Sequence, residues 1–170
     1  MNKNLIFLVG FMGCGKSTIG RKLAARTGFD FIDLDKMIEG KVGASIADYF
    51  KQHGEQAFRE LERDSLQKTD FPDKTIIATG GGAPCFFDNM DWMNRHGQTL
   101  YINLTPQTLA DRLEHGKAER PLISRFSQKE LVEFITEKLK EREVFYSQAQ
   151  HNLNGIGLNA EKLAEILGIG

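Results

Sequence analysis

Short, apolar, β-rich runs alternate along the chain with segments whose apolar residues recur at helical spacing. The runs lie at 5–9, 29–34, 75–79 and 99–104, with a weaker one near Asn152. Continuous short runs of this kind are typical of strands that are buried on both faces. Because strands and helices alternate, the pattern predicts βαβ units and a parallel sheet covered by helices on both sides.

The expected helices carry recognisable start and stop signals. Thr105 followed by Pro106 gives a cap residue and a first-turn proline, and Ser127 with Glu130 has the form of a capping box. Gly28 stands where a C-terminal cap is expected. The polar, basic stretch 116–126 has no periodicity and is predicted to be a loop. Helices are expected over 17–26, from a second capping box at 45–48 to about 54, over 55–68 and 88–96, from 105, from 127 to about 149, and over 159–167.

Composition narrows the class to one nearly neutral globular domain. The 170 residues are 41% hydrophobic and 26% charged, without repeats or linkers, so we expect a single domain over residues 1–170. The net charge of −1 argues against nucleic-acid binding and against a polybasic membrane anchor. Cys14 and Cys85 form no CxxC motif and indicate a reduced, cytoplasmic protein.

The beginning of the chain allows two interpretations. Lys3, an apolar run over 5–12 and then Gly13-Cys14 resemble a secretory or lipoprotein signal. The run is too short to span a bilayer. It is a buried strand if the residues that follow it belong to the folded protein.

A phosphate-binding motif follows the run at once. Residues 10–17, GFMGCGKS, fit G-x-x-x-x-G-K-[ST] at every fixed position. Glycines let backbone N–H groups turn towards phosphate oxygens, and the next helix directs its amino end at the same anion. Lys16 can reach the β- and γ-phosphates, and Ser17 can ligate Mg²⁺. Cleavage near Gly13-Cys14 would destroy the motif, so we expect 5–9 to be a core strand. The candidate ATP-binding residues here are Gly13, Cys14, Gly15, Lys16, Ser17 and Thr18.

Two carboxylates after the second strand favour a kinase. The chain has no D-x-x-G element and no internal N-K-x-D motif, which argues against a switch GTPase. In Asp33-Leu34-Asp35, side chains two apart on a strand point the same way, so both carboxylates are expected to face the phosphates. One can support Mg²⁺, and the other can orient an acceptor hydroxyl. The alternative is a helix N-cap for the turn that follows.

Two arginines are candidates for binding an anionic substrate. Arg142 falls on the apolar stripe of the long helix 127–149. An inward-pointing cation must pair or bind an anion, since burying it alone costs several kcal/mol. An internal salt bridge or a side chain that reaches solvent is the alternative. Arg59, considered alone, is expected at the surface, paired with Glu55 or Glu62.

Two further segments could complete such a site. Residues 80–82, three glycines, follow the third strand at the carboxyl end of the sheet, where ligands bind in α/β folds. A loose turn is the alternative. The loop 116–126 contains Arg120, which can stabilise transition-state charge if the loop closes over the phosphates. An ordinary solvated loop is the alternative.

Together these residues resemble the shikimate kinase family. The phosphate-binding motif alone is widespread, whereas the ordered set from residue 5 to about 149 is specific. The shared motifs are GxxGxGKS at 10–17, DxD at 33–35, FRxxE at 58–62, GGG at 80–82, RPL at 120–122 and RxxxY at 142–146.

The resemblance implies a fold, a reaction and an assembly. The fold is that of nucleoside-monophosphate kinases: three layers, α/β/α, with a five-stranded parallel sheet and a mobile lid over about 112–126. The reaction is transfer of the ATP γ-phosphoryl group to the 3-hydroxyl of shikimate, on the route to chorismate and the aromatic amino acids. We expect a monomer, because such a kinase must open and close freely.

The resemblance also implies roles for single residues. Asp35 would bind and orient the hydroxyl, and Arg59 and Arg142 would hold the substrate carboxylate beside the Gly81 backbone. Ser17 and Asp33 would serve Mg²⁺, Lys16 the phosphates, and Arg120 the lid contact to ATP, which makes Lys16, Asp35 and Arg120 the catalytic set. Family members carry another lid arginine before RPL, for which Arg112 is the candidate. Residues 154–157 offer no basic side chain to stack on adenine, so the base contact is unassigned.

Two other functions stay open at this point. The first is another small-molecule kinase, such as one for gluconate or a nucleotide; paired arginines with Asp35 favour an acidic polyol, and gluconate is one too. The second is a nucleotide-dependent binding module without catalysis. The intact set of Lys16, Ser17, Asp33, Asp35 and Arg120 argues against such a module.

Overall fold

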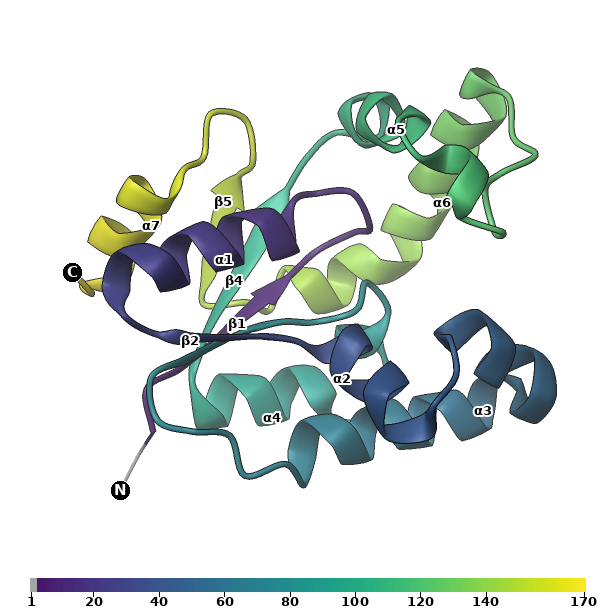
Figure 1. The fold of residues 1–170 in the computed structure, drawn as a ribbon. Coiled ribbons are helices and arrows are strands. Elements are labelled where there is room, and N and C mark those ends of the chain that lie inside the picture. The colour runs from purple at the N-terminus through teal and green to yellow at the C-terminus, as the bar shows by residue number, and fades with distance from the viewer. Residues whose placement is uncertain (1–2) are drawn as a thin grey trace.

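Five parallel strands form one sheet at the centre of the molecule (Figure 1). The computed structural model describes residues 3–170, so Met1 and Asn2 of the expected domain lie outside the described residues. The strand order is β2-β3-β1-β4-β5, which confirms the predicted α/β class with a five-stranded parallel sheet. The strands are β1 (Leu5–Val9), β2 (Asp30–Asp33), β3 (Thr75–Ala78), β4 (Gln98–Asn103) and β5 (His151–Asn154).

Helices cover both faces of this sheet and complete the three layers (Figure 1). One face packs against α1 and α7, and the other against α3 and α4. The helices in the described residues are α1 (Lys16–Thr27), α2 (Leu34–Val42), α3 (Ile46–Gln67), α4 (Asn89–His96), α5 (Pro106–Glu114), α6 (Gln128–Tyr146) and α7 (Ala160–Leu167), with 3-10 turns η1 (Ala83–Cys85) and η2 (Lys117–Glu119).

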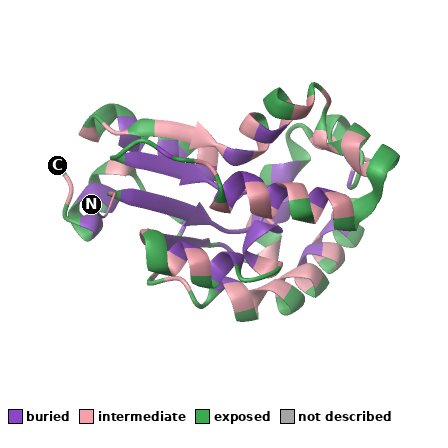
Figure 2. Cartoon of the chain, turned by 90° about the horizontal axis from the view of Figure 1, so that it is seen from below, coloured by how far each residue is buried: buried purple, intermediate pink, exposed green. Residues whose placement is uncertain are grey.

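The central strand β1 is buried along its whole length. Its residues alternate between the faces: Ile6 and Leu8 join the core under α1 and α7, while Leu5, Phe7 and Val9 join the core under α3 and α4. Figure 2 shows the inner strands in the buried colour between helices that are exposed on their outer sides. The run 5–9 is therefore a core strand, as predicted. It holds the loop that follows it at the middle of the sheet's carboxyl edge.

The second strand ends earlier than the sequence pattern predicts. β2 stops at Asp33, and α2 begins at Leu34 because the Asp33 carboxylate caps it, with Oδ1 accepting from the Lys36 N–H at 3.2 Å. Asp35 therefore lies in the first helical turn and not on the strand. The expectation that Asp33 and Asp35 share a strand face was wrong, and the N-cap alternative holds for Asp33.

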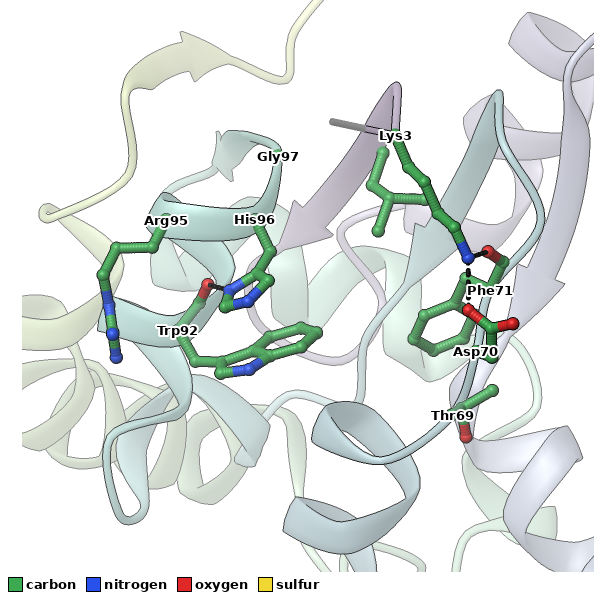
Figure 3. A pocket seen from close by; sticks show the side chains of 9 residues that line it. Lys3, Thr69, Asp70, Phe71, Trp92, Arg95, His96 and Gly97 are labelled. Atoms are coloured by element: carbon green, nitrogen blue, oxygen red, sulfur yellow. Dashed lines mark hydrogen bonds and ion pairs between the residues drawn. The ribbon is translucent and has the colours of Figure 1, made fainter. Parts of the chain in front are cut away.

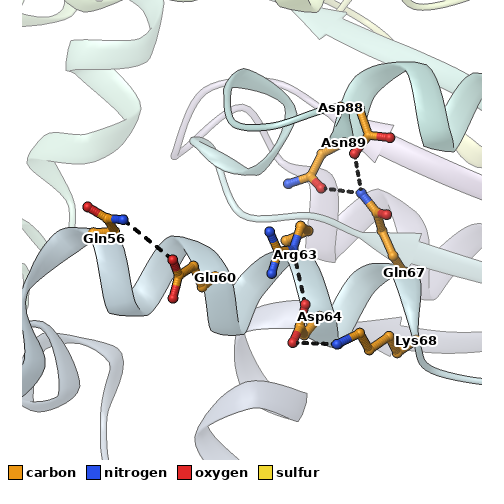
Figure 4. A network of polar contacts seen from close by, with 8 residues as sticks. All are labelled: Gln56, Glu60, Arg63, Asp64, Gln67, Lys68, Asp88 and Asn89. Carbon is orange, nitrogen blue, oxygen red and sulfur yellow. Dashed lines mark hydrogen bonds and ion pairs between the residues drawn. The ribbon is translucent and has the colours of Figure 1, made fainter.

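The two helices predicted around Gly54 form one element with a kink. Gly54 has φ 84° and ψ 172°, outside the helical region. The Ser45 hydroxyl accepts from the Asp48 N–H at 3.1 Å, which gives one half of the predicted capping box. After the kink, polar contacts run along α3 and connect it to the start of α4 (Figure 4). Gln67 Nε2 donates to Asn89 Oδ1 at 2.9 Å, and buried Asn89 donates to the Ala83 carbonyl at 2.9 Å, which anchors η1.

The predicted lid starts later than residue 112. Arg112 still belongs to α5, and the irregular segment follows the end of that helix. Ile123 is fully buried in the core beneath it, whereas Arg120 and Leu122 are exposed. The capping box of Ser127 opens α6 as predicted, but α6 ends at Tyr146 and not near 149. Across residues 3–170, no helix has both the length and the apolar character that a membrane crossing requires.

Candidate active site

The loop between β1 and α1 folds as a phosphate cradle. Gly10, Gly13 and Gly15 have φ of 147°, 81° and 96°, which residues with a Cβ rarely adopt. At Gly10 a Cβ would also lie 2.9 Å from the Ile102 carbonyl oxygen. The loop thus requires these glycines, and α1 begins directly behind it with no side-chain cap on its first N–H groups.

Lys16 stands at the base of this cradle. Its side chain is only 8% exposed. The ammonium donates to the carbonyls of Gly10 at 2.6 Å and Phe11 at 3.1 Å. These two hydrogen bonds hold a buried cation directly over the loop, where an anion would meet it.

Ser17 and Asp33 form a pair of hard oxygen donors beside the cradle. The Ser17 hydroxyl donates to Asp33 Oδ2 at 2.9 Å. In residues 3–170 no group of three or more His, Cys, Asp or Glu side chains could hold a metal ion unaided. One hydroxyl and one carboxylate fit Mg²⁺, which prefers oxygen ligands and takes most of the others from phosphates and water.

Asp35 and Glu62 meet at the first glycine of the turn after β3. A Cβ on Gly80 would lie 2.8 Å from Asp35 Oδ1 and 3.3 Å from Glu62 Oε2. Burial, reinforced by the neighbouring Asp33 carboxylate, raises the pKa of Asp35. Burial also raises the pKa of Glu62 to about 7, against the lowering effect of Arg59. Each carboxyl group here therefore holds its proton more tightly than an exposed one does.

Arg59 is largely enclosed, so the expectation that it lies at the surface was wrong. Its side chain is 12% exposed and donates from Nη1 to Glu62 Oε1 at 2.9 Å. The expected pairing with Glu55 also forms, at 3.6 Å from Nε. The Phe86 ring lies 4.1 Å from the guanidinium carbon. Since Nε is buried without a hydrogen-bond partner, the guanidinium keeps donor capacity for an anion.

Arg142 approaches the same glycine turn from α6. A Cβ on Gly81 would lie 3.2 Å from Arg142 Nη1, and one on Gly82 would lie 2.6 Å from Arg59 Nη1. The two guanidiniums therefore flank the turn closely, and a side chain on Gly82 would collide with one of them. This close packing excludes a loose turn. It also places the two guanidinium groups beside backbone that carries no side chains.

Two adjoining cavities connect the phosphate cradle, Asp35 and the loop that follows α5. The first, of about 330 Å³, extends from the phosphate cradle to Gly80 and Gly81, and the second, of about 510 Å³, lies between α2 and the loop that follows α5. Asp33, Asp35 and Arg120 border both. The exposed Arg120 of that loop thus borders the same cavities as the two carboxylates.

A third cavity lies on the other side of the cradle. It has a volume of about 350 Å³ between α1, α5 and the segment after β5. Arg112 borders it and donates from Nη1 to the Cys14 carbonyl at 3.3 Å. No motif links these segments in sequence, which is why sequence reasoning left this pocket unassigned. Its lining includes Thr18, Ile19, Lys22, Gly155, Leu158 and Asn159.

Comparison with known proteins identifies the family. A family model described as "Shikimate kinase" matches residues 12–167. The chain belongs to the shikimate kinase family. The shikimate kinase of Parabacteroides distasonis is 46% identical over 158 residues, which cover 93% of this chain and 88% of that protein.

Solved structures of shikimate kinases agree with the fold described above. The crystal structure of the Bacteroides thetaiotaomicron shikimate kinase superposes with a TM-score of 0.93 at 40% identity, covering 98% of this chain and 99% of that one. The Acinetobacter baumannii shikimate kinase in complex with shikimate gives a TM-score of 0.84 at 31% identity, covering 98% and 94%.

Two residues of the shikimate kinase motifs received no role from sequence reasoning. Glu62, at the end of FRxxE, is 1% exposed and pairs with Arg59. Tyr146, at the end of RxxxY, is fully buried, and its hydroxyl donates to the Gly81 carbonyl. Their presence in the motifs was the available signal. The pairing of Glu62 with Arg59 was among the expected ones, whereas only the tertiary structure reveals the partner of Tyr146.

A further cavity lies at the opposite, amino edge of the sheet, away from the motifs that mark a shikimate kinase (Figure 3). It has a volume of about 400 Å³, and the Lys3 ammonium crosses it to Asp70 and to the Phe71 carbonyl. Trp92 and His96 stack on its other side, with ring centroids 4.1 Å apart. None of the predicted site residues lines this cavity.

Proposed function

We propose that the chain transfers the γ-phosphoryl group of ATP to the 3-hydroxyl of shikimate, giving ADP and shikimate 3-phosphate. The observation that carries this is the position of Arg59 and Arg142 around the glycine turn, with the Asp35 carboxylate facing Gly80 beside them. The two arginines can form ion pairs with the carboxylate of an acidic polyol, and Asp35 can accept a hydrogen bond from one of its hydroxyl groups. The phosphate cradle opens into a cavity that Asp35, Gly80 and Gly81 also line.

The phosphates of ATP bind the loop and the amino end of α1. Backbone N–H groups of residues 13–18 contact the phosphate oxygens, and Lys16 exchanges its carbonyl partners for the β- and γ-phosphates. The adenine enters the third cavity, where Arg112 offers a flat cation to the base. This gives Arg112 a role on the nucleotide.

Ser17 and Asp33 would hold Mg²⁺ together with the phosphates. When bound, Mg²⁺ neutralises charge that develops on the β- and γ-phosphoryl oxygens. The Ser17–Asp33 hydrogen bond keeps the two oxygens together, which orients both towards the cradle.

Shikimate binds by its two chemically different ends. Arg59, Arg142 and the backbone of Gly81 hold the carboxylate. Asp35 accepts a hydrogen bond from the 3-hydroxyl and can take its proton, which the raised pKa of Asp35 favours. Because phosphoryl transfer has a loose transition state, orienting the hydroxyl contributes more than removing its proton. Arg120 closes over the γ-phosphate as the lid moves, excluding water and stabilising charge.

The protein acts as a monomer in the cytoplasm. Two free cysteines in the described chain, Cys14 and Cys85, suit a reducing compartment. A single chain supplies residues for every part of the site, so no second copy is required.

ADP release in the presence of MgATP tests the assignment. Shikimate, gluconate and nucleoside monophosphates are compared as acceptors. We expect turnover with shikimate, and the phosphorylated product should carry its phosphate at the 3-hydroxyl by ³¹P–¹H correlation. Turnover with gluconate alone would establish the rival kinase, and nucleotide binding without turnover on any acceptor would establish a binding module.

A further inference from the structure

The three glycines after β3 are held by hydrogen bonds of two kinds. The Gly80 carbonyl accepts from the Ala83 N–H at 3.1 Å, and the Gly82 carbonyl accepts from the Cys85 N–H at 3.0 Å. Both bonds lie within the turn itself. The middle carbonyl, that of Gly81, accepts instead from the Tyr146 hydroxyl of α6. The middle of the turn is therefore held from another element.

This external bond restrains a segment that has little restraint of its own. Glycine has the widest backbone freedom of any residue, and three in succession add that freedom together. Because the peptide group is planar and trans, fixing the Gly81 carbonyl also fixes the direction of the Gly82 N–H on the other side of the same plane. The place and tilt of this peptide thus depend on Tyr146.

The surroundings of Tyr146 keep its hydroxyl protonated, so that it always donates a hydrogen bond. Its ring is fully buried and packs against the Tyr101 ring at a centroid distance of 5.0 Å. Burial raises its pKa well above the usual value, so the hydroxyl stays protonated wherever the protein is folded. It also stands one helical turn after Arg142, so both side chains project from the same face of α6 to the same turn.

We propose that the Tyr146 hydroxyl is a positioning group for substrate: it holds the Gly81–Gly82 peptide at the place where, with Arg59 and Arg142, the turn receives the substrate carboxylate. The inference rests on the proposed function for the identity of that substrate. Tyr146 itself does not touch substrate. It keeps the backbone surface between the two guanidiniums in one orientation, which lowers the entropy lost on binding.

Tyr101 supplies a matched control. It is 1% exposed, its ring packs on that of Tyr146, and its hydroxyl donates to Glu143 Oε2 at 2.8 Å and not to the glycine turn. Tyr146→Phe and Tyr101→Phe each remove one hydroxyl group together with its hydrogen bonds, and keep the ring. Only the first releases the Gly81 carbonyl.

The test compares KM for shikimate, KM for MgATP, kcat and thermal midpoint in both variants. We expect Tyr146→Phe to raise the KM and the calorimetric Kd for shikimate about tenfold, the loss of about one hydrogen bond, with KM for MgATP within about twofold of wild type. Tyr101→Phe should lower the thermal midpoint similarly and leave both KM values within about twofold. Arg142→Ala gives the larger shikimate-specific loss that serves as a benchmark.

Equal effects of Tyr146→Phe on the two KM values, or a lower thermal midpoint with unchanged shikimate affinity, would overturn the positioning role. Absence of shikimate turnover in the wild type would refute the proposed function instead, which separates the two failures.

A second experiment applies if the Tyr146→Phe variant does not fold. It uses the wild-type protein labelled with 3-fluorotyrosine. Its three ¹⁹F signals are assigned with Tyr49→Phe and Tyr101→Phe. Shikimate should shift the Tyr146 signal, and a Tyr146 signal that does not respond overturns the role.

Discussion

Single residues of the site combine function with a cost in stability. Asp35 and Glu62 are carboxyl groups whose burial raises their pKa above the ordinary value. A buried carboxylate is unfavourable unless something compensates it. Glu62 has Arg59 as a partner at 2.9 Å, whereas at Asp35 burial and the Asp33 carboxylate outweigh the attraction of Lys16 and Arg59 and raise its pKa. Stability alone does not account for a carboxylate at residue 35.

Asp35→Asn should therefore separate turnover from stability. The amide cannot take a proton from a hydroxyl and orients it less well, so kcat should fall by about 10² or more. The free energy of unfolding at about pH 7 should stay the same or rise, because the variant buries no charge. Steady-state kinetics and urea denaturation measure the two quantities. Wild-type turnover in the variant would remove Asp35 from the catalytic set.

Glu62 makes stability depend on pH in a predictable direction. Its pKa is about 7 in the folded protein and 4.5 in its ordinary state, so between these values the folded state binds more protons than the unfolded state. The Glu62 contribution to the free energy of unfolding is then full below about pH 4.5 and is lost as pH rises to about 7.

The comparison of wild type with Glu62→Gln isolates this contribution. The wild-type free energy of unfolding minus that of the variant should fall by about 1–3 kcal/mol between about pH 4.5 and pH 8. Urea denaturation across that range, without ligands, measures it. A difference that is constant, or that grows with pH, would show that Glu62 is ionised throughout.

At the scale of elements, the kink in α3 directs its second half towards the glycine turn. Gly54 takes φ 84° and ψ 172°, and five residues later Arg59 enters the site. A Cβ at Gly54 would meet nothing within 4 Å, so only the backbone conformation calls for glycine. Gly40, inside α2, is also free of neighbours within 4 Å but is helical.

These two glycines should respond to alanine in opposite ways. Gly54→Ala should lower the free energy of unfolding by about 1–3 kcal/mol, since residues with a Cβ strongly disfavour this conformation. Gly40→Ala should raise it by about 0.5–1 kcal/mol, because alanine favours the helix. Chemical denaturation compares both with wild type. Equal stability of the two variants would mean that the kink does not depend on glycine.

At the scale of the whole molecule, the sequence predicted those parts of the site that depend on residues close together in the chain. It missed the features that depend on packing between distant segments. The cradle at 10–17 is a local motif, so its glycines and Lys16 were predictable. Asp35 lines one cavity with the cradle, but not by the predicted strand geometry, because the cap at Asp33 ends the strand. The burial of Arg59 depends on Phe86 and Glu62, and the place of Arg112 depends on α5 packing against the cradle. Neither follows from spacing along the chain.

The stacked pair of Trp92 and His96 at the amino edge of the sheet gives the protein a useful fluorescence signal. Trp92 is the only tryptophan in the chain, and it lies between His96 and Phe7, at the edge opposite the cradle. Its emission should shift to longer wavelength when the protein unfolds and stay nearly constant when ATP or shikimate is added. One sample can then be titrated with substrate and melted while its fluorescence reports the integrity of the fold alone.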